Sequence, residues 1–263
     1  MGVSSRFGYT ADHRAGTFVP FCREEWRLPM AKHIGIVSVS YEGAALCYQT
    51  ICSEAESVMG EYRHPEITMH TFQLADYLHF ASRLDWEGVA GLLLESAGKV
   101  AGAGADFAIC PANTAHEAFE IMRPRSPIPW LHIVEVVAEE ARGRGLKKLG
   151  ILGTRFLMEG NVYREILSDH AIEAVIPEAD ERQRINALIF DELVKGTLEG
   201  STREYFRGVV AELASAGCDG AVMACTEIPL ILRQEDVEVP LLDSTRLLAK
   251  AALEEALGAA KYV

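Results

Sequence analysis

Two stretches of the chain resemble each other, and this internal repeat constrains the fold more than any other feature of the sequence. Residues 105–114 can be placed over residues 218–227 without a gap. In each stretch a short apolar run ends in small or polar residues, ahead of a segment with a helical pattern. The matched pairs are Asp106 with Asp219, Ala108 with Ala221, and Ala112 with Cys225.

A second pair of segments supports the repeat. Residues 34–38 (IGIVS) resemble residues 149–153 (LGILG), at a similar interval ahead of Ala112 and Cys225. Short apolar runs alternate with longer helical patterns along the whole stretch from His33 to residue 258, which is typical of βαβ units with parallel sheets. We therefore expect an α/β fold with two lobes of similar layout, whose equivalent strand-to-helix junctions face a shared cleft.

The pattern predicts where the elements lie. Strands are expected at 33–37, 67–72, 107–110, 130–133, 149–152, 175–176, 220–224 and 240–242, and helices at 43–59, 83–103, 114–122, 134–144, 159–168, 180–196, 202–216 and 244–258. Residues 1–31 lack periodicity and are expected to form an irregular extension. The first lobe is expected to comprise residues 32–128 with 243–263, and the second lobe residues 129–242.

Composition excludes several classes of partner. The net charge is −13 and no basic run is present, which argues against nucleic acid or an anionic membrane surface as a partner. A small anionic substrate needs only a local group of N–H donors, so it is compatible with this negative net charge. No stretch approaches about 20 apolar residues, so no membrane span is expected.

The cysteines favour a cytoplasmic location. Six are scattered along the chain without a C-x-x-C pair, and no secretory leader is expected from residues 1–31, which lack an apolar core. They are expected to be reduced thiols, and no His/Cys cluster has the spacing of a metal site.

Cys225 is the candidate reactive thiol. It follows the strand expected at 220–224, and anions bind where helices begin after the parallel strands of such folds. A helix N-terminus would also lower the pKa of a cysteine from about 8.5. We therefore expect an activated thiol here.

The two junctions resemble motifs of the aspartate/glutamate racemase superfamily. Its members carry P-C-N-T-A-H and G-C-T-E, and this chain reads PANTAH at 111–116 and ACTE at 224–227. Thr154, in the turn Gly150–Thr154, and Lys195 are also similar. The resemblance covers about residues 33–258. It implies two Rossmann-like lobes related by a pseudo-twofold axis, with the active site between them.

The resemblance also implies the chemistry. Such enzymes remove a Cα proton without pyridoxal phosphate or another cofactor, using one thiol on each face of a small carboxylate substrate, an amino acid or diacid. N–H donors stabilise the charge that builds up on that carboxylate. Relatives are often dimers, so a homodimer is the assembly implied.

This sequence departs from the family pattern at the first motif. The cysteine expected there is Ala112, and a methyl group cannot carry a proton. Thr114 and His116 are candidates to relay a proton on that face, and Cys225 is the acid/base on the other. Substrate contacts are expected from Ser38, Ser40, Tyr41, Ala112, Asn113, Thr154, Lys195, Thr226 and Glu227. Serines in such a loop more commonly cap helices.

The leading hypothesis is a cofactor-independent amino-acid racemase or epimerase. A decarboxylase of malonate-type diacids is the enzymatic alternative, because it needs a thiol on one face only. A maleate-type isomerase fits less well because it relies on two cysteines. A catalytically silent carboxylate-binding homologue is the non-enzymatic alternative.

Overall fold

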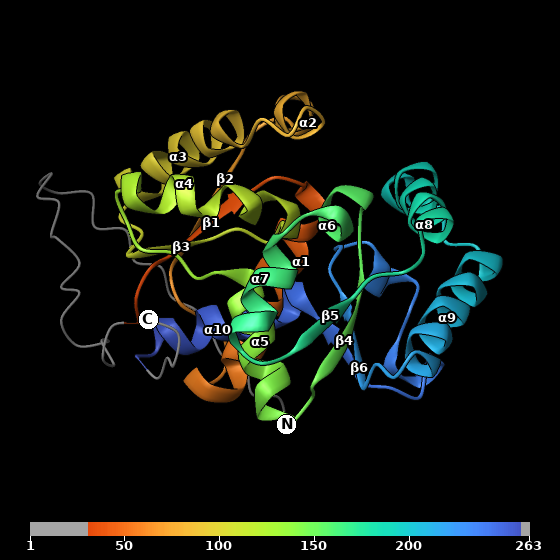
Figure 1. The fold of residues 1–263 in the computed structure, drawn as a ribbon. Helices are drawn as coiled ribbons and strands as arrows, with labels where there is room; N and C mark the ends of the chain where they lie inside the picture. The colour runs from red at the N-terminus through yellow and green to blue at the C-terminus, as the bar shows by residue number, and fades with distance from the viewer. Residues whose placement is uncertain (1–30, 259–263) are drawn as a thin grey trace, which may run out of the picture. The chain divides into compact units, whose positions relative to one another are not determined.

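Two separate parallel sheets organise the chain, as the alternating pattern predicted (Figure 1). The computed structural model describes residues 31–258, so the expectation for the N-terminal extension lies outside the described residues, apart from Ala31. The first sheet has the order β2-β1-β3 and the second β5-β4-β6-β7. Their strands are β1 (Ile34–Ser38), β2 (Ile67–Thr71), β3 (Phe107–Ile109), β4 (Lys148–Leu152), β5 (Glu173–Val175), β6 (Gly220–Met223) and β7 (Leu241–Asp243).

The sheets repeat each other in strand order and in register. β1 and β4 each lie between a following strand and the strand that precedes a candidate junction. Gly35 of β1 pairs with Ala108 of β3, and Gly150 of β4 pairs with Ala221 of β6. These are the residues that the sequence alignment matched. The internal repeat is therefore a structural one.

The two aspartates of the repeat make the same contacts in both lobes. The Asp106 carboxylate accepts the backbone N–H of His33 at 2.7 Å, and the Asp219 carboxylate accepts that of Lys148 at 2.9 Å. The backbone N–H of each aspartate donates in return to the carbonyl of the same partner. Each pair joins the beginnings of two neighbouring parallel strands. The first backbone groups of these strands would otherwise lack hydrogen-bond partners.

Ten α-helices of the described residues surround the sheets. Their bounds are α1 (Tyr41–Met59), α2 (Leu74–Ala81), α3 (Trp86–Gly102), α4 (Phe119–Met122), α5 (Ile133–Gly143), α6 (Arg155–Glu159), α7 (Val162–Asp169), α8 (Ala179–Asp191), α9 (Gly200–Ser215) and α10 (Ser244–Ala256). Short 3₁₀ helices cover Asn113–Ala118, Arg123–Arg125, Leu193–Lys195, Ile228–Leu230 and Gln234–Asp236.

A shared core joins the inner faces of the sheets, and each outer face has its own core. Ile36 of β1 and Ile151 of β4 belong to one apolar cluster with residues of α1, α5 and α10. Val37 of β1 packs instead with α2 and α3, and Leu152 of β4 with α8 and α9. Because side chains alternate along a strand, both faces of the central strands are buried, as in other parallel sheets.

The structure differs from the expected elements in five places. The segment expected to be a helix at 114–122 is a 3₁₀ helix up to Ala118 and an α-helix only over Phe119–Met122, and the helix expected at 159–168 is preceded by a separate helix, α6. The helix expected at 83–103 is preceded by a separate helix, α2, which was not expected. The helix expected at 180–196 ends at Asp191 and continues only as a 3₁₀ turn. The strand expected at 130–133 reduces to one bridge, in which Trp130 pairs in parallel with Ala108 of the first sheet, because α5 begins at Ile133.

Gly150 is a strand position where the repeat leaves no room for a side chain. A Cβ there would lie 2.7 Å from Leu213 Cδ1 on α9, and one at Gly35 would lie 2.8 Å from Val100 Cγ2 on α3. We expect Gly150→Ala to lower the free energy of unfolding by about 1–3 kcal/mol through overpacking. Gly98→Ala is the control, because its Cβ would meet nothing within 4 Å and should raise stability by about 0.5–1 kcal/mol. Urea denaturation of both variants measures the difference.

Candidate active site

A single serine hydroxyl ties the two repeated junctions together. Ser244, the first residue of α10, donates from Oγ to the carbonyl of Met223 at 3.0 Å, two residues before Cys225. The same Oγ accepts from Asn113 Nδ2 at 2.9 Å, and Asn113 directly follows Ala112. Both side chains are buried. The carboxyl end of β6 and the segment after β3 are therefore held against a common point.

Asn113 is held from the other side by Tyr163 of α7. The phenol donates to Asn113 Oδ1 at 2.8 Å, so the amide uses both its oxygen and its nitrogen within the protein. These contacts position the loop that carries Asn113, and the expected contact between Asn113 and the substrate stays a prediction. Neither Ser244 nor Tyr163 was among the candidate residues, because a hydroxyl whose partner lies 131 or 50 residues away along the chain leaves no local pattern.

Cys225 lies at the end of β6 with its sulfur against a carboxylate. Its Sγ donates to Glu227 Oε2 at 2.9 Å, and the residue is half-buried. Burial is the main cause that raises the pKa of this thiol well above its ordinary value, and the negative charge of Glu227 adds to it. The backbone N–H groups of Thr226 and Glu227 act in the opposite direction. At neutral pH the sulfur therefore carries its proton.

This protonation state differs from our expectation. A helix N-terminus was expected to lower the pKa of Cys225, but the residues after it form a turn and then only the 3₁₀ helix Ile228–Leu230. One 3₁₀ turn lacks the aligned peptide dipoles of a regular α-helix. The two backbone N–H groups are what the junction offers to a thiolate or to a substrate anion.

The start of α1 contacts both junctions through a glycine. A Cβ at Gly43 would lie 2.6 Å from the methyl group of Thr226 and 2.9 Å from the carbonyl oxygen of Pro111. Only a residue without a side chain permits this approach. Ser40 caps the same helix, accepting from the backbone N–H of Gly43 at 3.3 Å, which is the common role of such a serine.

Tyr41 lies beside this contact and is exposed. The pKa of its phenol is raised chiefly by a hydrogen bond to Glu42, and the carboxylate of Glu227 also contributes. Tyr41 and Glu227 are therefore within electrostatic range of each other. Ser38, in contrast, is buried at the end of β1 and donates to the carbonyl of Ser40 at 3.2 Å.

Thr114 and Thr154 face each other where the two lobes meet. Their hydroxyl oxygens lie 3.4 Å apart, and Thr154 also caps α6 by accepting from the backbone N–H of Leu157. The preceding residue, Gly153, packs against the Ala224 carbonyl, since a Cβ on it would lie 3.1 Å from that oxygen. Thr114 is thus linked to the residue before Cys225 through a short series of contacts.

Two other candidates make no contact with this group. Lys195 is exposed and pairs with Asp191 of the same segment at 3.6 Å. His116 is buried, donates from Nε2 to the carbonyl of Cys110 at 3.0 Å, and packs against Phe119 and His132. Burial lowers the pKa of its imidazole to about 4, so the ring is neutral at pH 7. The structure brings Thr114 toward the Cys225 loop and turns His116 toward a separate cavity.

Loss of the Asn113 side chain is expected to loosen both junctions. In Asn113→Ala the buried Tyr163 hydroxyl has no acceptor, and Ser244 keeps one partner of two. Each buried polar group left without a partner costs about 1–3 kcal/mol, so we expect a fall of that size or more in the free energy of unfolding. Gln49→Ala, at an exposed position within α1, is the control and should change stability by less than about 0.5 kcal/mol. Thermal or urea denaturation tests the pair.

The sequence of the chain matches the family model of Asp/Glu/hydantoin racemases over residues 34–252. This range includes both junctions and nearly all of the described elements. The chain belongs to the Asp/Glu/hydantoin racemase family. Membership supports an isomerase that acts as an amino-acid racemase.

Relatives of the Asp/Glu/hydantoin racemase family resemble the chain in sequence and in fold. The broad specificity amino-acid racemase RacX of Bacillus subtilis (strain 168) is 28% identical over 170 residues, which cover 65% of this chain and 73% of RacX. A candidate Asp/Glu racemase from Yersinia pestis superimposes with a TM-score of 0.80 at 30% identity, covering 86% of this chain and 99% of that structure. An aspartate racemase homologue from Pyrococcus horikoshii OT3 gives 0.76 at 29% identity over 86% and 99% of the two chains.

These structures confirm the α/β fold with two parallel sheets that the sequence predicted. In the part of this racemase-family chain that the structure describes, no helix combines the length and the apolar character of a bilayer span.

Proposed function

We propose that the chain inverts the configuration at the Cα of a small amino acid, or exchanges its Cα proton with solvent. The Cys225 thiol is the acid/base on one face of the substrate. The observation that carries this proposal is the hydrogen bond from Cys225 Sγ to Glu227 Oε2 at the end of β6, 2.9 Å long. A thiol that acts both as acid and as base needs a labile proton to deliver and a nearby group that can take up that proton when the thiol acts as base, and this pair supplies both.

Glu227 completes the proton transfer in this proposal. With the thiol protonated, Cys225 can deliver a proton to a carbanion at the substrate Cα. For removal of the Cα proton, the thiol must first lose its own, and Glu227 Oε2 is the acceptor at hydrogen-bond distance. The backbone N–H groups of Thr226 and Glu227 then stabilise the thiolate.

Thr226, Ser40 and Tyr41 are the groups that we assign to the substrate carboxylate. Thr226 contacts Gly43 at the start of α1, and Ser40 and Tyr41 flank that helix terminus. A helix N-terminus with free N–H groups favours an anion. Ala112 occupies the equivalent position in the first repeat and provides no proton on the second face, where we assign Thr114, alone or through water, as the relay.

A one-sided decarboxylase is the second candidate. The raised pKa of the Cys225 thiol favours it, because a malonate-type diacid needs only a proton donor after CO₂ leaves. The enediolate left behind takes up the thiol proton on one face. A methyl group at Ala112 is compatible with this reaction, since no base is needed opposite.

Incubation with amino acids and diacids in D₂O distinguishes the two reactions. The full chain is mixed with L- and D-enantiomers of a panel of amino acids and with 2-substituted malonates, and ¹H NMR follows the Cα proton while CO₂ is trapped. Loss of the Cα–H signal without CO₂ supports the racemase. CO₂ release with one deuterium in the product supports the decarboxylase. Neither signal on any compound leaves only the silent homologue and contradicts the proposal.

A further inference from the structure

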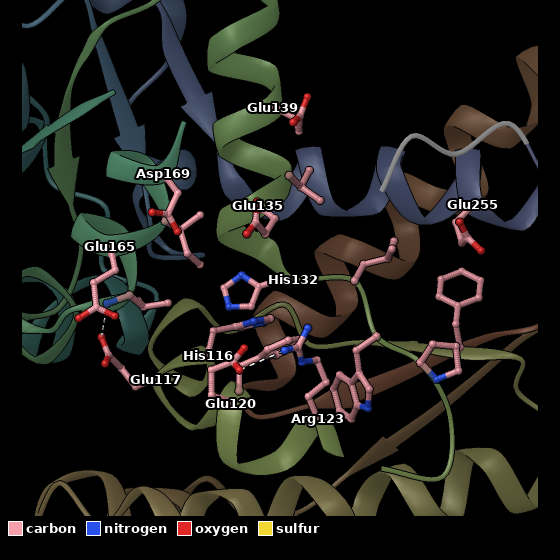
Figure 2. A pocket seen from close by; sticks show the side chains of 18 of the residues that line it. His116, Glu117, Glu120, Arg123, His132, Glu135, Glu139, Glu165, Asp169 and Glu255 are labelled. Atoms are coloured by element: carbon pink, nitrogen blue, oxygen red, sulfur yellow. Dashed lines mark hydrogen bonds and ion pairs between the residues drawn. The ribbon is translucent and has the colours of Figure 1, made fainter. Parts of the chain in front are cut away.

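A cavity of about 770 Å³ lies among α4, α5, α7 and α10 and receives no residue from the Cys225 loop. Figure 2 shows its side chains, with His116 and His132 at the centre and carboxylates around them. The volume is in the range of sites for small organic ligands. None of the reaction steps proposed above uses this cavity.

The lining of the cavity is strongly acidic. Seven carboxylates face two cationic side chains, Lys32 and Arg123, and each cation is already paired, with Glu255 and Glu120 respectively. The seven are Glu117, Glu120, Glu135, Glu139, Glu165, Asp169 and Glu255. Within residues 31–258, Glu165 and Asp169 of α7 form no ion pair. The cavity therefore favours a cation.

Aromatic rings form the remainder of the wall. Phe107, Phe119 and Trp130 line the cavity, and the guanidinium of Arg123 already lies 5.9 Å from the centre of the Phe119 ring. Ring faces attract cations and also accommodate methylene chains. Within the described residues, no three His, Cys, Asp or Glu side chains are arranged to hold a metal ion. An organic cation fits this combination better than an inorganic one.

An unpartnered nitrogen identifies the kind of contact the cavity lacks. His116 is 4% exposed, and its Nε2 donates to the Cys110 carbonyl, so the neutral ring has an acceptor lone pair on Nδ1. Among the described residues, Nδ1 has no hydrogen-bond partner. The neighbouring His132 accepts the Val134 N–H at Nδ1 and is neutral too, because burial lowers its pKa to about 2. A ligand that donates N–H would satisfy His116.

We propose that this cavity binds an aliphatic di- or polyamine. Its ammonium groups lie against Glu165 and Asp169, its methylenes pack on Trp130 and Phe119, and one N–H donates to His116 Nδ1. Amines of this class carry separated positive charges on a flexible apolar chain, which matches carboxylates on several helices around an aromatic wall. The site is distinct from the proposed reaction centre and does not depend on the reaction.

Calorimetric titration of the full chain with spermidine tests the proposal. We expect saturable binding at one site per chain in about 0.15 M salt, where diffuse surface attraction is largely screened. The double variant Glu165→Gln/Asp169→Asn should raise Kd at least tenfold. The matched control Glu212→Gln/Asp191→Asn removes the same charge from α8 and α9 and should leave Kd within twofold.

A second variant separates the cavity from general acidity. Trp130→Leu keeps every charge but removes the largest ring of the wall, and it should also raise Kd. Circular dichroism checks that each variant is folded. Absence of saturable spermidine binding would overturn the proposal, and so would equal affinity in both double variants or competition by Mg²⁺ at equal ionic strength. Because the readout is binding, a failure here leaves the racemase proposal untouched.

Discussion

Cys225→Ser is expected to reduce Cα proton exchange by about 10²–10⁴-fold, the usual contribution of a positioned acid/base group. A serine hydroxyl can keep a hydrogen bond to Glu227, so the fold should persist, but a hydroxyl is far less acidic than a thiol. The loss should therefore appear mainly in kcat. Steady-state racemisation, followed by circular dichroism of the substrate, measures it.

Cys52→Ser is the matched control for this prediction. Cys52 is a free, half-buried thiol on α1, outside the group of residues around Cys225. Its replacement should leave kcat within about twofold and the melting temperature unchanged. If Cys225→Ser retained full activity while Cys52→Ser did not, the catalytic thiol would have been assigned to the wrong lobe.

Ala112→Cys is expected to raise the rate of interconversion between enantiomers by about 10²-fold or more, because it supplies an acid/base group on the second face. The physical basis is the repeat. Ala112 and Cys225 follow strands that pair in the same register, and Asn113 and Met223 are tied to one Ser244 hydroxyl. A thiol at each position would then meet the substrate from opposite sides.

Ala112→Ser is the control for the gain. It adds a hydroxyl of similar size without a group that ionises near neutral pH, so we expect little or no increase in rate. Assays contain a reducing agent, which prevents a disulfide between the introduced thiol and Cys225. A folded, reduced Ala112→Cys protein with unchanged rates would show that the second face of the substrate lies elsewhere.

The repeat carried most of the fold prediction. Strands that are buried on both faces leave a strong apolar signal in the sequence. The equivalent glycines Gly35 and Gly150 lie where α3 and α9 leave no room for a Cβ. The structure then gives β1–β3 and β4–β6 equivalent registers, in agreement with the alignment of Asp106 with Asp219. Helix α2 was missed because Leu74–Ala81 is short and its apolar residues cover most of its length, so no clear helical stripe distinguishes it.

The site could be predicted as positions but not as contacts. Cys225 and Glu227 were singled out, yet their hydrogen bond depends on how the turn folds, and the expected helix there would have given the opposite pKa shift. His116 was a candidate relay from its place after Ala112. The structure makes this segment a 3₁₀ helix and places His116 in the lining of the cavity among α4, α5, α7 and α10, which the local sequence pattern did not indicate.

The claim on which the proposed function depends is that one sulfur, that of Cys225, exchanges a proton with the substrate carbon. The most direct measurement is deuterium incorporation at Cα from D₂O for each pure enantiomer, with the unmodified chain and Cys225→Ser compared side by side by NMR. We predict incorporation with the unmodified chain, faster for one enantiomer, and at least a hundredfold less with the variant. Equal incorporation by both proteins would contradict the proposed role of the thiol.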